Sequence, residues 1–249
     1  MTHHPVRYDG SLEWTLPPNG EDVWFTTADG VKLHGWFLHA SQTSARGTVL
    51  YSHGNGGNLT YFKGIAADLA KRGLDVLLYD YRGYGRSEGL APSEVELYAD
   101  ADAAYEYLTN TRQVRTDNLA ICGLSLGTTV STDLAARKPC GVLVLEAPLS
   151  SASDMATATL PIIPRQLHWI LKNRFESARK IANVKCPVLI THGDADEIIP
   201  TEQGRKVFAA ANEPKKLLII PTGSHWLASE SGYLDSITEF ILANLKPKP

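Results

Sequence analysis

The sequence predicts an α/β protein with a mainly parallel central sheet and helices on both faces. Short runs rich in Val, Ile and Leu alternate along the chain with longer segments of helical pattern. Most of these runs are apolar at nearly every position, as in strands that are buried on both faces. Two runs near the N-terminus flank an Asp-Gly turn signal, which predicts an antiparallel hairpin at one edge of the sheet.

The apolar runs give the expected strands in chain order. The hairpin is expected at 23–27 and 31–39, and further strands at 48–53, 75–80, 118–123, 141–147, 187–193 and 216–221. Helices are expected at 59–73, 93–110 and 125–137, and at about 201–211 and about 232–245. The first helix ends at Gly73, a common C-terminal signal. The second begins at Ser93 with Glu96 three residues on, which matches a capping box.

The length and composition predict a single domain over residues 1–249. The hydrophobic fraction of 43% supplies enough apolar material for one large core. Residues 148–182 break the rhythm of strands and helices and contain three prolines, Pro148, Pro161 and Pro164. This segment predicts a short cap insertion over one end of the sheet.

Composition also argues against several partners and cofactors. The formal net charge is −3 and no Lys/Arg-rich run is present, so neither nucleic acid nor an anionic membrane surface is expected. No apolar run has the 18 or so residues of a membrane span, and the N-terminus lacks the apolar centre of a signal peptide. The cysteines Cys122, Cys140 and Cys186 show no CxxC or zinc spacing. Free buried thiols indicate a reducing compartment and predict a cytoplasmic protein, and no metal or other cofactor is expected.

Five polar, glycine-rich motifs each follow a predicted strand. They read SHGNGGN, DYRGYGRSEG, GLSLG, HGDADEIIP and TGSHWL in chain order. Parallel sheets bind ligands at the carboxyl ends of their strands. The five loops are therefore expected to meet at one edge of the sheet and to form a site there.

The motif GLSLG at 123–127 is typical of a nucleophile elbow. A sharp turn from strand to helix lifts the hydroxyl of Ser125 from the backbone, and the flanking glycines let the turn approach neighbouring strands. The alternative is a glycine-rich turn with an idle serine. A serine nucleophile needs a base that takes its proton. After such an elbow, the acid and then the histidine base follow the serine along the chain.

Three histidines follow the serine. His225, in the loop after the last strand, is the expected base. His168 is expected to pack within the insertion, and His192 to brace the neighbouring acid loop. The expected acid is Asp196, because its loop is long enough to turn the carboxylate back toward the histidine. Asp194, which can also cap its own turn, and Glu146, at the end of another strand, remain alternatives for the acid.

Two backbone N–H groups are expected to form an oxyanion hole, those of Asn55 and Leu126. Arg82 and Arg86 either hold a substrate carboxylate or, as favoured here, pin loops by salt bridges. The indoles of Trp169 and Trp226 either line an acyl pocket or pack in the core, and no other substrate-binding residue is indicated.

The five ordered motifs, from about residue 22 to 245, resemble the α/β-hydrolases. The similarity is to the small-cap branch, which includes abhydrolase-domain depalmitoylases and many bacterial serine esterases. The resemblance implies Ser125 as nucleophile, Asp196 as acid, His225 as base, and Asn55 and Leu126 as oxyanion donors. It implies the α/β-hydrolase fold with a minimal cap, and the serine at the elbow argues against haloalkane dehalogenases.

These residues predict a serine hydrolase that cleaves small-molecule carboxylic esters of short to medium acyl chain through an acyl-enzyme. A thioesterase or an aminopeptidase-like amidase on the same triad is the alternative, because specificity depends on pocket shape. A catalytically silent binding protein with the same fold is a more remote one.

Overall fold

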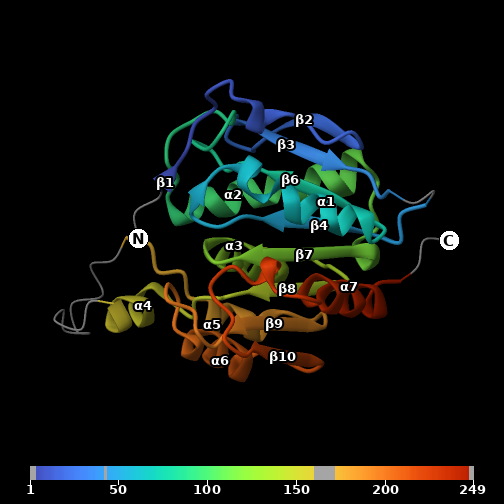
Figure 1. Cartoon of the computed structure of the whole chain (residues 1–249). Helices are drawn as coiled ribbons and strands as arrows, with labels where there is room; N and C mark the ends of the chain where they lie inside the picture. The colour runs from blue at the N-terminus through green and yellow to red at the C-terminus, as the bar shows by residue number, and fades with distance from the viewer. Residues whose placement is uncertain (1–3, 42–43, 160–171, 247–249) are drawn as a thin grey trace.

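The computed structural model describes residues 4–41, 44–159 and 172–246, and its centre is an eight-stranded sheet in the order β10-β9-β8-β7-β4-β6-β3-β2 (Figure 1). The strands are β2 Gly20–Thr26, β3 Lys32–Leu38, β4 Gly47–Ser52, β6 Leu74–Tyr79, β7 Leu119–Leu124, β8 Val142–Glu146, β9 Val188–Gly193 and β10 Lys215–Ile220. Strands β6, β4, β7, β8, β9 and β10 run parallel, whereas β3 pairs antiparallel with both β6 and β2. The predicted fold class, a mainly parallel sheet with an antiparallel N-terminal hairpin, is confirmed.

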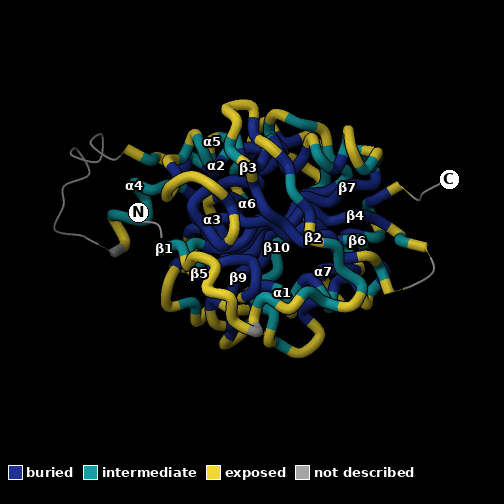
Figure 2. The backbone as a smooth tube through the Cα atoms, turned by 90° about the horizontal axis from the view of Figure 1, so that it is seen from above, coloured by how far each residue is buried: buried dark blue, intermediate teal, exposed yellow. Residues whose placement is uncertain are grey.

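The sheet separates two apolar cores because its central strands are buried on both faces. In β7, Leu119 and Ile121 belong to one core, and Ala120, Cys122 and Leu124 belong to the other. Figure 2 shows these central strands as a buried layer surrounded by more exposed helices and loops. The alternation explains why the strands read as continuous apolar runs in the sequence.

Helices cover both faces. On one face lie α1 (Lys63–Lys71) and α7 (Tyr233–Asn244), and on the other α2 (Glu94–Glu106), α3 (Leu126–Arg137) and α6 (Thr201–Ala210). The short α5 (Ser177–Lys180) packs against α3 and α6. The described residues also form a π-helical turn, η3 Tyr107–Thr111, and short 3-10 turns at η1 Leu12–Trp14, η2 Leu59–Phe62, η4 Thr116–Asn118, η6 Ile181–Asn183 and η7 Leu227–Ser229.

The expected elements lie within a few residues of the observed ones. The helix expected at 59–73 begins as η2 and continues as α1, and the helix expected at 93–110 ends in η3. The capping box at Ser93 and Glu96 forms as expected. The insertion expected at 148–182 contains α4 (Ala152–Thr159) and α5, whereas its residues 160–171 lie outside the described part of the chain.

An N-terminal strap was not predicted. The two-residue strands β1 (His4–Pro5) and β5 (Gly56–Gly57) pair in parallel beside the main sheet. The strap continues past them, because the Val6 N–H donates to Gly57 O at 2.9 Å and the Tyr8 N–H donates to Gly85 O at 3.0 Å. These are backbone contacts between distant segments, which leave no periodicity in the sequence.

The strand order contains a switch point that positions the site. From β4 the chain passes to β6 on one side of it and then crosses to β7 on its other side. Ligands of open α/β sheets bind where the order reverses, beyond the carboxyl ends of the strands. The loops that follow β4 and β7 carry the SHGNGGN and GLSLG motifs.

Candidate active site

Ser125 occupies a strained turn between β7 and α3. Its backbone has φ 55° and ψ −117°, a conformation that non-glycine residues rarely adopt. The Ser125 N–H donates to Glu146 O of β8 at 2.9 Å, and Ser125 O accepts from the Thr128 N–H at 3.0 Å. The turn is therefore held from the strand side and from the helix side, as a nucleophile elbow requires.

The two glycines of GLSLG allow this turn to pack tightly. A Cβ at Gly127 would lie 1.9 Å from Ser52 O in β4, and one at Gly123 would lie 2.3 Å from Gly127 O. Both contacts are with backbone atoms, which cannot turn aside as a flexible side chain would. The close approach expected from the sequence is thus present, and it presses the start of α3 against the end of β4.

Asp196 and His225 meet at the same edge of the sheet. His225 Nδ1 lies 2.8 Å from Asp196 Oδ2, and the side chains are 6% and 0% exposed. The second carboxylate oxygen, Oδ1, accepts the N–H groups of Ile198 and Ile199, each at 2.8 Å. With Nδ1 facing the carboxylate, the Nε2 atom of His225 is the one left to act as a base.

His192 braces the acid loop. Its Nε2 lies 2.8 Å from Ile199 O and 3.2 Å from Asp196 Oδ2. Burial opposes the charged form of Asp196, but the His192 and His225 rings and the Ile199 N–H outweigh it and hold the pKa of Asp196 below its usual range. Asp196 is therefore a carboxylate at neutral pH.

The acid loop and the histidine loop pack directly on each other. A Cβ at Gly193 would lie 2.0 Å from Gly223 O, so only glycine fits there. The Ala195 N–H donates to Gly223 O at 3.0 Å, and Asp194 Oδ1 accepts the Thr222 N–H at 2.5 Å. Asp194, considered as an acid or as a cap of its own turn, instead holds the backbone of the histidine loop.

Gly54 and Phe62 connect the turn of Ser125 to the loop that carries His225. A Cβ at Gly54 would lie 3.7 Å from Ser125 Cβ and 3.8 Å from the Phe62 ring. The Phe62 ring centre lies 6.0 Å from that of Trp226, the residue after His225. Within the described residues no hydrogen bond joins Ser125 Oγ to the His225 ring. Such bonds often tighten only when substrate is present, and a serine hydroxyl reorients by rotation about one bond.

Two tyrosines anchor the loop that carries Asn55. The Tyr84 hydroxyl donates to Asn55 O at 2.9 Å and lies 3.3 Å from its Oδ1. The Tyr81 hydroxyl donates to His53 O at 2.8 Å. Leu126 is the first residue of α3, and N–H groups in the first turn of a helix have no partner within it. Asn55 therefore lies in the anchored loop after β4, and Leu126 directly follows Ser125 at the start of α3.

Asp80 is a buried carboxylate that the sequence motifs did not single out. It is fully buried at the end of β6, accepts the Leu59 N–H at 2.7 Å, and lies 3.5 Å from His53 Nε2. Burial opposes its charge, but the His34 and His53 rings outweigh it and hold the pKa of Asp80 below the usual range. Its position directly after an apolar strand, at the edge where the motifs gather, was the available signal.

Comparison with known proteins shows the family to which the chain belongs. Residues 43–180, more than half of the chain, match the family described as serine aminopeptidase, S33. The chain belongs to this α/β-hydrolase family. The α/β-hydrolase is 37% identical over 227 residues to an uncharacterized protein of Mycobacterium tuberculosis, with 90% of this chain and 80% of the relative covered. It is 33% identical to the α/β hydrolase domain-containing protein 17B of Xenopus tropicalis, with 88% and 74% covered.

Solved structures share the fold of this α/β-hydrolase. The Pyrococcus furiosus esterase Pf2001 superposes with a TM-score of 0.76 at 19% identity, covering 98% of each chain. An acetyl xylan esterase from Paenibacillus sp. R4 superposes with the same TM-score of 0.76 at 18% identity, covering 91% of this chain and 84% of the other. At these identities the likeness shows the fold.

The remaining candidates of the α/β-hydrolase have structural roles or lie outside the described residues. Arg82 pairs with Asp100 and Asp29, at 2.8 Å and 2.7 Å, so it pins loops as favoured from the sequence. Arg86 likewise pairs with Asp22 at 3.0 Å. His168 and Trp169 fall within 160–171, outside the described residues.

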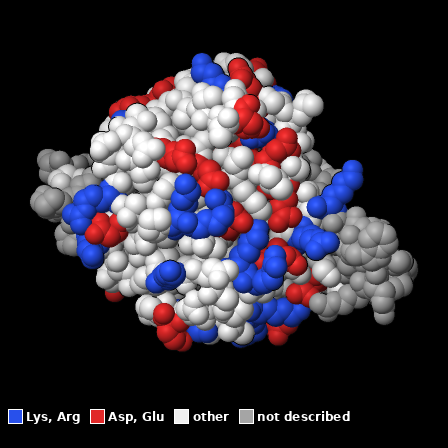
Figure 3. Space-filling view, turned by 180° about the vertical axis from the view of Figure 1, so that it is seen from behind, with Lys and Arg blue, Asp and Glu red and all other residues white. Residues whose placement is uncertain are grey.

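No membrane-crossing helix and no metal centre occurs in the described part of the hydrolase. None of its described helices is long and apolar enough to cross a bilayer. Nor do the residues that the structure describes contain three or more His, Cys, Asp or Glu side chains grouped as metal ligands. On the face drawn in Figure 3, acidic and basic side chains are interspersed.

Glu146 lies in a buried polar cluster beneath the elbow. Its carboxylate accepts the hydroxyls of Tyr51 at 3.1 Å and Tyr233 at 2.8 Å. Burial raises the pKa of Glu146 to about 7, although both tyrosine hydroxyls act in the opposite direction. The carboxylate that contacts His225 is that of Asp196, whereas Glu146 contacts the two tyrosine hydroxyls.

Replacing Glu146 by glutamine is expected to change how stability depends on pH. The unfolded chain releases this proton near pH 4.5, whereas the folded protein keeps it up to about pH 7. Between these two pH values the unfolded state binds fewer protons than the folded state. The free energy of unfolding of the native protein therefore falls as the pH rises, by about 3 kcal/mol more than that of Glu146→Gln. Urea unfolding of both proteins at pH 4.5, 6 and 8 measures the difference. Parallel pH profiles would show that Glu146 titrates normally.

Proposed function

We propose that this α/β-hydrolase cleaves carboxylic esters of short to medium acyl chain with Ser125 as nucleophile, His225 as base and Asp196 as acid. The proposal rests chiefly on one observation: a serine in a strained elbow and a histidine–aspartate pair at 2.8 Å occupy the same edge of one sheet. Ester hydrolysis by a serine needs these three groups and no cofactor.

The geometry suggests how a reaction would proceed. Ser125 Oγ attacks the ester carbonyl while His225 Nε2 takes its proton. Asp196 holds Nδ1–H and stabilises the imidazolium that forms. The imidazolium then protonates the leaving alcohol, and water attacks the acyl-enzyme by the same route.

The tetrahedral intermediate needs donors for its oxyanion. We assign this role to the backbone N–H groups of Leu126 and Asn55. Leu126 begins α3, where the helix dipole favours developing negative charge. Removing one such donor typically costs about 10²–10³ in turnover. Tyr84 holds Asn55 in place by its hydroxyl, so it is a positioning residue in this scheme.

Apolar side chains beside the triad fit an acyl group. Trp226 and Ile198 are 49% and 50% exposed although both are large and apolar. Trp226 follows the base, and Ile198 donates its N–H to the acid. Trp226 is therefore not packed in the core, which was one of its two interpretations. An exposed apolar margin favours acyl groups over charged ones.

A matched substrate panel tests the proposal. The kcat/KM values of p-nitrophenyl esters of increasing chain length, the corresponding thioesters and aminoacyl p-nitroanilides are compared, each with Ser125→Ala as the blank. We expect esters of short and medium chain to be the best substrates. Faster cleavage of the thioesters or of the anilides would contradict the ester assignment. The anilides are included because the matching family is described as serine aminopeptidase.

A further inference from the structure

Two cysteines that the sequence leaves unpaired lie side by side. Cys140 precedes β8 and Cys186 precedes β9, and these strands are neighbours in the sheet. Their sulfur atoms are 3.3 Å apart although the residues are 46 positions apart in the chain. The expectation of three buried thiols is wrong for this pair, because both residues are half-buried, whereas Cys122 in β7 is buried.

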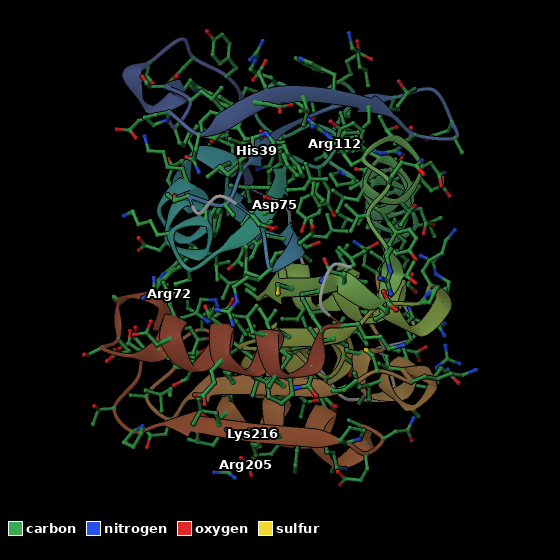
Figure 4. All side chains as sticks on the ribbon, turned by 90° about the vertical axis from the view of Figure 1, so that its right-hand side faces the viewer. His39, Arg72, Asp75, Arg112, Arg205 and Lys216 are labelled. Carbon is green, nitrogen blue, oxygen red and sulfur yellow. The ribbon has the colours of Figure 1, made fainter. Side chains whose placement is uncertain are left out.

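The pair lies at the end of the sheet opposite to Ser125. Figure 4 faces this end, where the parallel strands begin, with Asp75 of β6 and Lys216 of β10 labelled. Ser125 follows the carboxyl end of β7, so chemistry at the thiols and chemistry at the triad occur at separate edges.

A cavity of about 310 Å³ gives small reagents access to the thiols. Cys140 and Cys186 both line it, together with the cationic side chains of Arg137, Lys138 and Lys185. Cys122 is not among the lining residues, and it is 2% exposed. The thiolate is the reactive form of a thiol, and the cavity lets a small oxidant reach it.

The two thiols are not equivalent. The hydrogen bond between them lowers the pKa of Cys186, against the effect of burial, and the same bond together with burial raises the pKa of Cys140. Of the two thiols Cys186 therefore loses its proton more readily, so it is the one expected to attack an oxidant.

We propose that Cys140 and Cys186 are a peroxide-reactive thiol pair that closes to an intramolecular disulfide. The Cys186 thiolate attacks one oxygen of hydrogen peroxide, which forms a sulfenic acid and releases hydroxide. Cys140 then attacks the sulfenic sulfur and displaces its oxygen as water. Two thiols and one peroxide thus give one disulfide and two waters, and a dithiol reductant reverses the change.

The backbone already favours closure. The Leu143 N–H donates to Pro187 O at 3.0 Å, so the two strands are joined just beyond the cysteines. The sulfurs have to approach from 3.3 Å to the length of a disulfide, roughly 2.05 Å, which rotation of the side chains can supply. The bond would close a loop that contains α4 and α5.

Peroxide oxidation of the fully reduced protein tests the proposal. We expect the number of thiols titrated in denaturant to fall from three to one, and peptide mapping to find Cys140 joined to Cys186 with Cys122 still free. The loop closure is expected to raise Tm by about 4–16 °C, and dithiothreitol should reverse the rise. A linked protein whose Tm does not rise would contradict the stabilising effect.

Two conservative variants separate the roles of the thiols. In Cys140→Ser the sulfenic acid of Cys186 has no partner, so dimedone should trap it there. In Cys186→Ser, dimedone should label neither remaining cysteine under the same conditions. A disulfide that involves Cys122, a disulfide between chains, or three thiols that survive peroxide would overturn the proposal.

Discussion

Ser125→Ala is expected to lose ester hydrolysis by at least about 10⁴-fold in kcat. In the proposed mechanism Ser125 Oγ forms the bond to the acyl carbon, and no neighbouring group replaces it. The residual rate would come from the oxyanion donors and from substrate binding alone. Steady-state kinetics on the best ester of the panel measure the loss.

Two further variants make the result interpretable. Ser229→Ala removes an exposed hydroxyl that donates to Trp226 O at 2.9 Å, near the site but outside the triad, and should retain nearly full activity. Ser125→Gly relieves the backbone strain at φ 55° and should be inactive. Its free energy of unfolding should exceed that of the native protein by about 1 kcal/mol. Substantial turnover by Ser125→Ala that is properly folded would remove Ser125 from the mechanism.

Asp196→Asn is expected to lower kcat by about 10⁴-fold with a small change in KM. The amide carries no charge to stabilise the His225 imidazolium. It can also present N–H to His225 Nδ1, which places the ring proton on Nε2, where the base must be free. The contacts of Oδ1 with the Ile198 and Ile199 N–H groups can be kept by the amide oxygen, so the loop should still fold.

Asp194→Asn and Glu146→Gln are the matched controls, because both carboxylates were alternatives for the acid. Asp194 accepts the Thr222 N–H with one oxygen, and the amide oxygen of asparagine can do the same. The decrease in kcat for Asp194→Asn should therefore be far smaller. Glu146 contacts the hydroxyls of Tyr51 and Tyr233 rather than His225. Equal losses in Asp196→Asn and in either control would show that Asp196 is not the acid.

Local signals explain why much of the architecture was predictable. The apolar strands read as continuous runs because both faces of the sheet are buried. The tight turn at Ser125 was predictable from its two flanking glycines, because a Cβ at either position would overlap backbone atoms. The contact between Asp196 and His225 agrees with the expectation from loop order, since both loops follow the last two strands of a parallel sheet.

Features that depend on contacts between distant segments were not predictable. The strap pairs His4 with Gly56 through backbone atoms, which leave no side-chain pattern. Tyr84 is a core residue whose hydroxyl reaches Asn55 across 29 positions, and the sequence does not show which loop a buried tyrosine contacts. Cys140 and Cys186 meet only because β8 and β9 are neighbours, and their spacing matches no cysteine motif.

Labelling with a fluorophosphonate probe tests the central claim most directly, because the probe reacts with a serine only when a base and an oxyanion hole activate it. The account predicts one adduct per chain, on the peptide that contains Ser125, and greatly reduced labelling of His225→Ala and of Asp196→Asn. An adduct on another residue, or equal labelling of the native protein and of Ser125→Ala, would contradict it.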